Sequence, residues 1–402
     1  MSPSFMNDEI RGLIENHRLG WTLARPFYTD SAVYELEVER IFRKSWLFAG
    51  HISRIPKPGD YFLYEFEGES LIIIRADDDR LHALLNVCRH RGSRVCPDES
   101  GHVHYLVCPY HAWAYERDGR LKAARLMPDD FDRTQFGLCE ARLQVLEGFI
   151  FVSLADDPPD FTPVVRDIRP HLEPHEFGQV RICHTARRLV RANWKILAEN
   201  FRECYHCGPS HPELCRTLLL AAAVGSPRLT QKERHLNEQA MARWRQMGLV
   251  TDRVAHTVEN WFQAYRVPIG EGMVSLTLDG QFVAPPMGCF GDPEEVGHLN
   301  VAILPTFCLE ASVDHALIMC FTPVGPALTR LQMDWLVRGD AVEGVDYEVE
   351  RVTEMWQIVG DQDWKLCEDT QAGVTSRHYQ PGPYAEIESK PDIFVRWYLR
   401  QL

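Results

Sequence analysis

The chain has 402 residues and a mass of 46.3 kDa, which predicts two domains with full cores. Hydrophobic residues make up 45% and charged residues 25% of the sequence, values typical of globular proteins that exclude a disordered chain. The formal net charge of −14 argues against nucleic acid and anionic membranes as partners, because their phosphates would repel the protein.

No stretch approaches the roughly 20 apolar residues that a membrane span needs. The N-terminal segment carries acidic residues where a secretion signal has basic and then apolar ones, so we expect a cytoplasmic protein. The twelve cysteines therefore predict thiols or metal ligands rather than a disulfide framework.

The first 45 residues are predicted to be helical, because their apolar residues recur at helical spacing. Residues 46–155 contain short β-branched or aromatic runs and predict a small all-β domain. The runs cover residues 61–66, 70–75, 81–87, 103–107, 113–115 and 149–154, with a turn at 77–79.

A proline-rich connector leads into residues 156–402, where helical and strand patterns mix, so the predicted fold class is α+β. An amphipathic helix is expected over 193–207, and strands over 301–304, 316–321 and 331–337. A long helix should follow, with one apolar stripe made of Val345, Val349, Val352, Trp356 and Val359.

A first metal motif combines Cys88 and His90 with Cys108 and His111, in the pattern C-x-H…C-x₂-H. Two thiolates and two imidazoles fit either a tetrahedral zinc or a Rieske [2Fe–2S] cluster. Zinc fingers usually pair Cys with Cys and His with His, whereas each pair here is mixed and lies between predicted strands. The pattern therefore resembles the Rieske proteins.

A second metal motif follows in the predicted helix, where steps of four and three residues place Glu199, Glu203 and His206 on one face. Gly208-Pro209 should end that helix, and His211 precedes a second helix that begins at Pro212. Two imidazoles and one carboxylate form the facial triad of O₂-activating non-haem Fe(II) sites. Cys204 and Cys207 form a single C-x-x-C, which we interpret as packing residues.

Together the two motifs resemble the catalytic α subunit of Rieske non-haem iron oxygenases over nearly the whole chain. The resemblance implies helices at 1–45 that pack on the catalytic domain, a Rieske domain at 46–155 and a helix-grip catalytic domain at 156–402. It implies an oxygenase-type cluster, in which Cys96 has no disulfide partner and is a small buried residue. The third iron ligand would come from a late helix, with Asp363 as the candidate and Asp361 as the alternative.

The same resemblance implies a head-to-tail homotrimer. Glu203 would link His111 of one chain to His206 of the next and carry electrons from cluster to iron. The sequence has no G-x-G-x-x-G dinucleotide fingerprint, so electrons from NAD(P)H would arrive through a separate reductase.

The run around Glu203 and several other segments are most similar to the quaternary-ammonium branch, which contains glycine betaine and proline betaine demethylases. This implies N-demethylation of a betaine with O₂ and release of formaldehyde. The pocket should draw on residues 217–300, and aromatic faces are suitable partners for a quaternary ammonium. The candidates are Trp261, Phe262, Tyr265 and Phe307, whereas Arg266 is better explained as a structural residue.

Three alternatives stay open at this point. A Rieske oxygenase could instead hydroxylate an aromatic ring or demethylate an aryl ether. A pure electron carrier would use the cluster alone and leave two thirds of the chain unexplained. A structural zinc protein would hold neither iron nor a coloured cluster.

Overall fold

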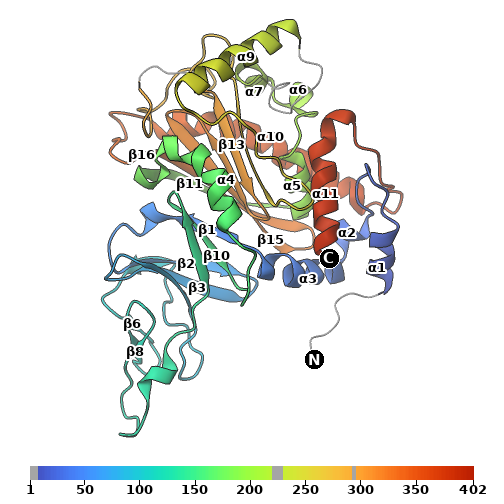
Figure 1. Ribbon diagram of the computed structural model, residues 1–402. Helices are drawn as coiled ribbons and strands as arrows, with labels where there is room; N and C mark the ends of the chain where they lie inside the picture. Colours follow the sequence, from blue (N-terminus) through green and yellow to red (C-terminus); the bar gives the residue numbers. More distant parts are fainter. Residues whose placement is uncertain (1–7, 220–229, 292–295) are drawn as a thin grey trace. The chain divides into compact units, whose positions relative to one another are not determined.

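The computed structural model describes residues 8–219, 230–291 and 296–402 (Figure 1). The chain divides into two compact units, one made of Met1–Phe42 and Phe161–Leu402 and the other of Arg43–Asp160. The second unit is thus an insertion between two parts of the first.

Antiparallel strands build the inserted unit, and they form three sheets with the orders β1-β10-β9, β4-β3-β2-β5 and β6-β7-β8. The strands expected at 61–66, 70–75 and 81–87 are confirmed as β2, β3 and β4. The strand expected at 103–107 is confirmed only at its end, as the two-residue β6, and the preceding β5 was missed. The bounds are β1 Leu47–His51, β2 Asp60–Phe66, β3 Glu69–Arg75, β4 Leu81–Leu85, β5 Ser100–His102, β6 Leu106–Val107, β7 Ala114–Tyr115, β8 Leu121–Ala123, β9 Arg142–Leu146 and β10 Phe149–Ser153.

A core of aliphatic and aromatic side chains lies under the loops of this unit and includes Ile72, Leu84 and Leu106, each with no exposed surface. Cys96 is 4% exposed in the same core and has a free thiol, as expected of a small buried residue. Burial raises the pKa of this thiol to about 12, so it stays protonated and inert.

The other unit contains one six-stranded antiparallel sheet with the order β11-β16-β15-β14-β13-β12. The strands expected at 301–304, 316–321 and 331–337 are confirmed as parts of β13, β15 and β16, and the sequence analysis missed the remaining three. The bounds are β11 Val180–Val190, β12 Phe262–Val267, β13 His298–Ile303, β14 Phe307–Ala311, β15 His315–Gly325 and β16 Leu328–Arg338.

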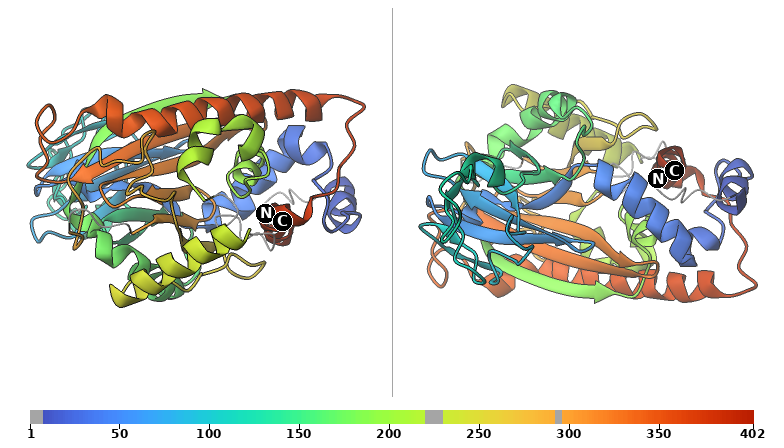
Figure 2. Two further views of the ribbon diagram at one scale, coloured as in Figure 1. Left: turned by 90° about the horizontal axis from the view of Figure 1, so that it is seen from above. Right: turned by 90° about the horizontal axis from the view of Figure 1, so that it is seen from below.

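Helices flank this sheet, and the longest, α10, runs along it beside β11 (Figure 2). The expected helical opening and the long late helix are confirmed, but α10 begins only at Val349, and Val345 is 81% exposed in the preceding turn. The α+β fold is thereby confirmed. The bounds are α1 Asp8–Glu15, α2 Pro26–Thr29, α3 Ser31–Arg40, α4 Thr162–Leu172, α5 Trp194–Asn200, α6 Cys207–Ser210, α7 Pro212–Thr217, α9 Gln231–Gln246, α10 Val349–Thr375 and α11 Ser389–Gln401.

A buried ion pair joins helix α3 to helix α5. Lys195 in α5 donates to Glu37 in α3 at 2.5 Å, and neither side chain is exposed. Glu37 also accepts hydrogen bonds from Trp194 at 2.7 Å and from Tyr398 of α11 at 2.6 Å. Because these bonds satisfy both carboxylate oxygens, the buried charge is compensated, and removing either partner would leave the other stranded.

Candidate metal centres and the cavity between helix and sheet

Two loops of the inserted unit share one backbone pattern. The amide of Cys88 donates to the carbonyl of Ser93, and the amide of Gly92 donates to the carbonyl of Cys88. The second loop repeats both bonds, from Cys108 to the carbonyl of residue 113 and from Ala112 back to Cys108. Gly92 (φ 76°) and Ala112 (φ 56°) occupy the left-handed turn at the same place in each loop. The unusual Ala112 conformation is thus required by the loop.

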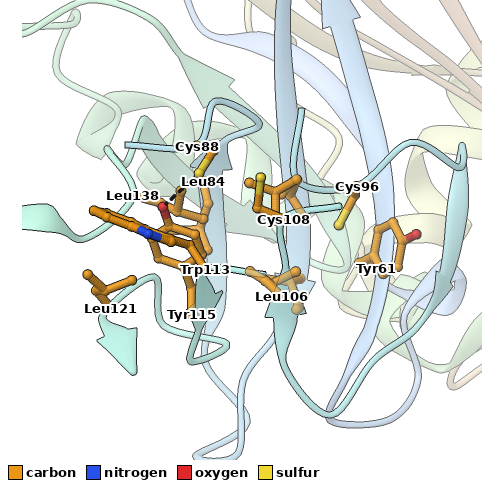
Figure 3. Packing of buried hydrophobic residues seen from close by; sticks show 13 residues of the cluster. Tyr61, Leu84, Cys88, Cys96, Leu106, Cys108, Trp113, Tyr115, Leu121 and Leu138 are labelled. Carbon is orange, nitrogen blue, oxygen red and sulfur yellow. Dashed lines mark hydrogen bonds between the residues drawn. The ribbon is translucent and has the colours of Figure 1, made fainter. Parts of the chain in front are cut away.

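The four predicted ligands lie on these loops with their cysteines inside and their histidines outside. Cys88 and Cys108 are 3% and 2% exposed, and Figure 3 shows their side chains close together in the core. His90 and His111 are exposed, with ring centres 4.6 Å apart. The indole of Trp113 stacks on the His90 ring at 4.8 Å and holds it in place.

This arrangement fits a Rieske cluster, in which two thiolates hold one iron and two imidazoles hold the other. The hydroxyl of Tyr115 lies 3.2 Å from Cys88 Sγ and accepts a hydrogen bond from the amide of Arg89 at 3.0 Å, so it can donate to a Cys88 thiolate. Burial raises the pKa of Cys88, so a cation is needed to hold it as a thiolate. A [2Fe–2S] cluster supplies that positive charge.

The second motif departs from the predicted helix. Helix α5 begins as expected, with the Asn193 side chain accepting from the amide of Lys195 at 2.9 Å, but it ends at Asn200. The carboxylate of Glu203 accepts from the amides of Tyr205 and His206, and these bonds replace helical ones. The prediction of one helix through Cys207 is therefore wrong. Glu199, Glu203 and His206 do not share a helical face.

Pro212 does begin a helix, as predicted, and His211 immediately precedes it. Gly208 and Pro209 lie within the short helix α6 and do not terminate a longer one, so that expectation is also wrong. The two histidines are therefore presented by two short helical turns.

His206, His211 and Asp363 converge although Asp363 is more than 150 residues away in the sequence. The Nε2 atoms of His206 and His211 lie 3.2 Å and 3.0 Å from the same Asp363 oxygen, Oδ1. His211 and Asp363 are 1% and 4% exposed. His211 and Asp363 are thus buried in the unit that contains the large sheet, and His206 is partly exposed there.

The outer nitrogens of both imidazoles are held by acceptors. His211 Nδ1 lies 2.7 Å from Gln362 Oε1, and the Gln362 amide nitrogen donates to Glu213, which fixes the orientation of the amide. His206 Nδ1 contacts a Glu203 carboxylate oxygen. Both Nδ1 atoms therefore carry hydrogens, and each Nε2 atom faces Asp363 with a hydrogen when no metal is bound or with a lone pair when one is.

Two lone pairs and a carboxylate oxygen that face each other repel unless a cation lies among them. The carboxylates of Asp363 and Glu203 outweigh burial and raise the pKa of His206 to about 9, and the pKa of His211 is raised as well. The site therefore attracts positive charge, and two imidazoles with one carboxylate suit Fe(II). The donor set fits a mononuclear iron.

Two other side chains were possible third ligands. Asp361 lies on the exposed side of α10 and pairs with Arg188, so its carboxylate is directed away from the triad. Cys207 Sγ lies within 4.8 Å of the ligand nitrogens of His206 and His211, but it forms a disulfide with Cys204. A disulfide sulfur is a poor ligand. This bond contradicts the expectation that the cysteines are thiols or metal ligands, although Cys207 is buried, as expected of a packing residue.

A sequence signal for Asp363 existed. The buried stripe of α10 runs through Val352, Trp356 and Val359, and the next step of four residues is Asp363. A carboxylate on an apolar stripe must have a partner, because an isolated buried charge is costly.

One cavity connects the triad to the sheet, and its walls enclose about 680 Å³, open solvent included. Most of the wall residues were missed by the sequence analysis. The cavity is lined by Asn200, Phe201, Arg202, Glu203, Cys204, His206, Cys207, His211, Leu214, Leu218, Tyr265, Val267, His298, Asn300, Glu310, Trp356, Val359, Asp363 and Lys390.

Tyr265 is the one predicted aromatic residue among these lining residues. Strand register explains why Phe262 and Phe307 do not line the cavity. Both pair with Ile303, one from each neighbouring strand, so the three side chains share one face of the sheet. The Tyr265–Asn300 pair lies on the opposite, cavity-facing side, because side chains alternate along a strand.

Trp261 packs against Phe161 with ring centres 6.2 Å apart and, like Phe262 and Phe307, is not among the lining residues that the structure describes. Arg266 is 2% exposed and donates to the carbonyl of Val296 at 2.8 Å, which is a structural role as expected. Within the expected pocket region 217–300, residues 220–229 and 292–295 lie outside the described residues.

Comparison with known proteins assigns both units. Residues 45–135 match the Rieske [2Fe–2S] domain, and residues 164–402 match the ring hydroxylating alpha subunit (catalytic domain). Among the described residues, no helix combines the length and apolar character needed to cross a membrane.

Whole-chain relatives agree with these matches. The glycine betaine monooxygenase oxygenase subunit of Chromohalobacter salexigens is 39% identical over 94% of this chain and 85% of its own length. Its counterpart in Pseudomonas aeruginosa is 37% identical over 95% of this chain and 89% of its own length. The carnitine monooxygenase oxygenase subunit of Escherichia coli K12 is 36% identical over 53% of this chain and 57% of its own length.

Solved structures share the fold. A quaternary ammonium Rieske monooxygenase superposes with a TM-score of 0.73 at 22% identity over 97% of both chains. Naphthalene 1,2-dioxygenase from a Rhodococcus species gives the same TM-score at 18% identity over 98% of both chains. The protein uses a [2Fe–2S] cluster and a mononuclear iron to activate O₂. The chain therefore belongs to the Rieske non-haem iron oxygenases, as an oxygenase alpha subunit.

Proposed function

We propose that this chain is the terminal oxygenase of a monooxygenase that N-demethylates a betaine-type quaternary ammonium compound. The observation that carries the proposal is the 39% identity, over 94% of the chain, to a glycine betaine monooxygenase oxygenase subunit. The cavity supports it, because aromatic side chains of Phe201, Tyr265 and Trp356 line the space beside the triad. Aromatic faces attract a cation that cannot donate hydrogen bonds.

The proposed reaction balances as follows. One oxygen atom of O₂ is inserted into an N-methyl C–H bond, and the other leaves as water after uptake of two electrons and two protons. The N–CH₂OH product then splits into formaldehyde, the tertiary amine and a proton. The electrons would come from NAD(P)H through a separate reductase.

When bound, the iron would supply O₂ activation. The surrounding side chains would orient its ligands and exclude water. Gln362 and Glu203 hold the Nδ1 hydrogens of the two ligand histidines, which keeps both Nε2 lone pairs aimed inward. Trp356 and Val359, from the buried stripe of α10, form an apolar wall that limits water beside the triad.

We also propose that Glu203 relays electrons, by linking His206 to His111 of a second copy of this chain in a head-to-tail homotrimer. Glu203, His206 and Asn200 line not only the triad cavity but also a second one of about 1160 Å³. The Glu203–His206 pair thus forms part of the wall between two spaces. A carboxylate in this wall can contact His206 on one side and an approaching imidazole on the other.

A formaldehyde-release assay tests the proposed reaction. Iron-loaded protein, a Rieske reductase and NADH are supplied with glycine betaine, proline betaine, carnitine, choline or a methoxybenzoate, with the Asp363→Ala variant as the blank. Formaldehyde from a betaine supports the proposal. Formaldehyde from the methoxybenzoate alone would move the protein to the aromatic branch, and no formaldehyde from any compound would overturn N-demethylation.

A further inference from the structure

Cationic side chains gather where the cavity reaches the sheet. Arg202, in the turn after α5, and Lys390, at the start of α11, both line the cavity that holds the triad. The Lys390 ammonium lies 4.2 Å from the centre of the Tyr265 ring, and the guanidinium carbon of Arg253 lies 4.9 Å from the same centre. Three cations therefore share this end of the cavity region.

One carboxylate, Glu310, lies among them, and the sheet already holds both of its oxygens. Asn300 Nδ2 donates to Oε1 at 2.5 Å, and His298 Nε2 lies 2.7 Å from Oε2. Strand register places Tyr265, Asn300 and Glu310 directly opposite one another across β12, β13 and β14. Glu310 is thus fixed in a row on the cavity-facing side, near Lys390.

The Arg202 guanidinium is only partly satisfied. Nη1 donates to the carbonyl of Ala198 at 2.6 Å, and the guanidinium carbon lies 4.7 Å from the Phe394 ring centre. Nε is buried and has no hydrogen-bond partner among the described residues. Arg202 also lines the cavity, where a guanidinium favours a ligand with acceptor oxygens.

The surroundings of Lys390 and Arg202 disfavour their positive charges. Burial, and then the charge of Arg253, lower the pKa of Lys390 to about 8 although Glu310 opposes the shift. Burial also lowers the pKa of Arg202 to about 10. An anion bound between the two side chains would restore both cations.

We propose that Arg202 and Lys390 bind the carboxylate of the substrate, so that this pocket selects a zwitterion over a purely cationic amine such as choline. The inference rests on the proposed function and specifies its substrate class. The same cations repel the methylated ammonium and direct it toward the opposite end, where His206, His211 and Asp363 lie. A single bound orientation follows from charge alone.

The test uses the iron-loaded holoenzyme and two substrates with the same trimethylammonium head, glycine betaine and choline. Lys390→Met is expected to raise KM for glycine betaine at least tenfold with a smaller change in kcat, and to lower the betaine-to-choline ratio of kcat/KM at least tenfold. Lys390→Arg should keep the ratio close to that of the wild type. Lys232→Met, which removes an exposed lysine on α9, is the matched control and should change nothing.

A ratio that Lys390→Met leaves within twofold of the wild type would overturn the inference. If Lys390→Met does not fold, as judged by circular dichroism and the visible spectrum, Lys390→Gln carries the same test.

Calorimetric binding of both compounds to the resting holoenzyme separates this inference from the proposed reaction. One outcome is that glycine betaine binds the wild type, binds Lys390→Met at least tenfold more weakly, and yields no formaldehyde. This outcome would support carboxylate recognition and overturn N-demethylation. Formaldehyde release with unchanged binding in the variant would support the reaction and overturn carboxylate recognition.

Discussion

The two metal centres place their imidazoles in opposite surroundings. In the inserted unit the cysteines are buried while His90 and His111 are exposed on loop tips. In the catalytic unit His211 is 1% exposed and faces a cavity together with Asp363. A centre that passes electrons onward benefits from exposed ligands. A centre that handles a reactive oxygen species benefits from walls that exclude water.

The largest expected effect is at the buried centre. Asp363→Ala removes the carboxylate on which both Nε2 atoms converge, so mononuclear iron should be lost and turnover should fall by about 1,000-fold or more. The visible Rieske spectrum should stay intact. Iron content, spectrum and turnover measure the three effects.

Asp361→Ala is the matched control for this variant, because Asp361 is exposed on the same helix and pairs with Arg188. It should retain iron and turnover. Loss of iron in Asp361→Ala, with iron retained in Asp363→Ala, would reassign the third ligand.

The corresponding change at the exposed centre is Cys108→Ser, which should abolish the visible Rieske spectrum and turnover while one iron per chain stays bound to the triad. Cys96→Ala is the control, since Cys96 is buried in the same core but forms no part of the two loops. Colour that survives in Cys108→Ser, or is lost in Cys96→Ala, would contradict the assignment of the cluster ligands.

A smaller effect is expected from Glu203→Gln. This variant tests the residue that is proposed to link the two metal centres. The amide keeps its size and one acceptor, so both metals should stay bound. Turnover should fall by about 10- to 100-fold, as is typical when a hydrogen-bond partner of a metal ligand is altered. Single-turnover oxidation of the reduced cluster by O₂ measures the step directly, and an unchanged rate would remove Glu203 from the electron path.

The smallest effect concerns pH. The folded-state pKa of Lys390 is about 8, so its charge is present below pH 8 and is lost as pH rises through that value. Burial and the charges of Arg253 and Arg202 disfavour the protonated form, whereas Glu310 and the face of Tyr265 favour it. KM for a betaine should therefore rise about tenfold between pH 7 and pH 9. Lys390→Arg should flatten the profile. A profile that is unchanged in this variant would assign the titration to another group.

Features that depend only on nearby residues in the sequence were predictable. The ligand spacing of the two loops, the start of α5 next to Asn193 and the helix start at Pro212 depend on neighbours in the chain, and each is where the sequence placed it. The helix break after Asn200 was not predictable from periodicity, because it depends on the carboxylate of Glu203 capturing backbone amides.

The cavity wall was harder still. Whether Tyr265 or Phe262 faces the triad depends on how β12 pairs with β13, and a shift of one residue would exchange the two faces. The row of Tyr265, Asn300 and Glu310 joins three strands whose pairing is a tertiary property. No pattern within any single strand contains that information.

The inserted unit also begins and ends in one place. Its first strand, β1, pairs with its last, β10, and Trp46 Nε1 donates to the carbonyl of Pro159 at 2.7 Å. For the surrounding unit, the insertion is therefore equivalent to a short loop. The entropy that this unit loses on closing the loop does not grow with the length of the inserted segment. A module with adjacent ends can be exchanged, lengthened or expressed separately at little cost to the host, so this topology allows an electron-transfer domain and an oxygenation domain to evolve at independent rates.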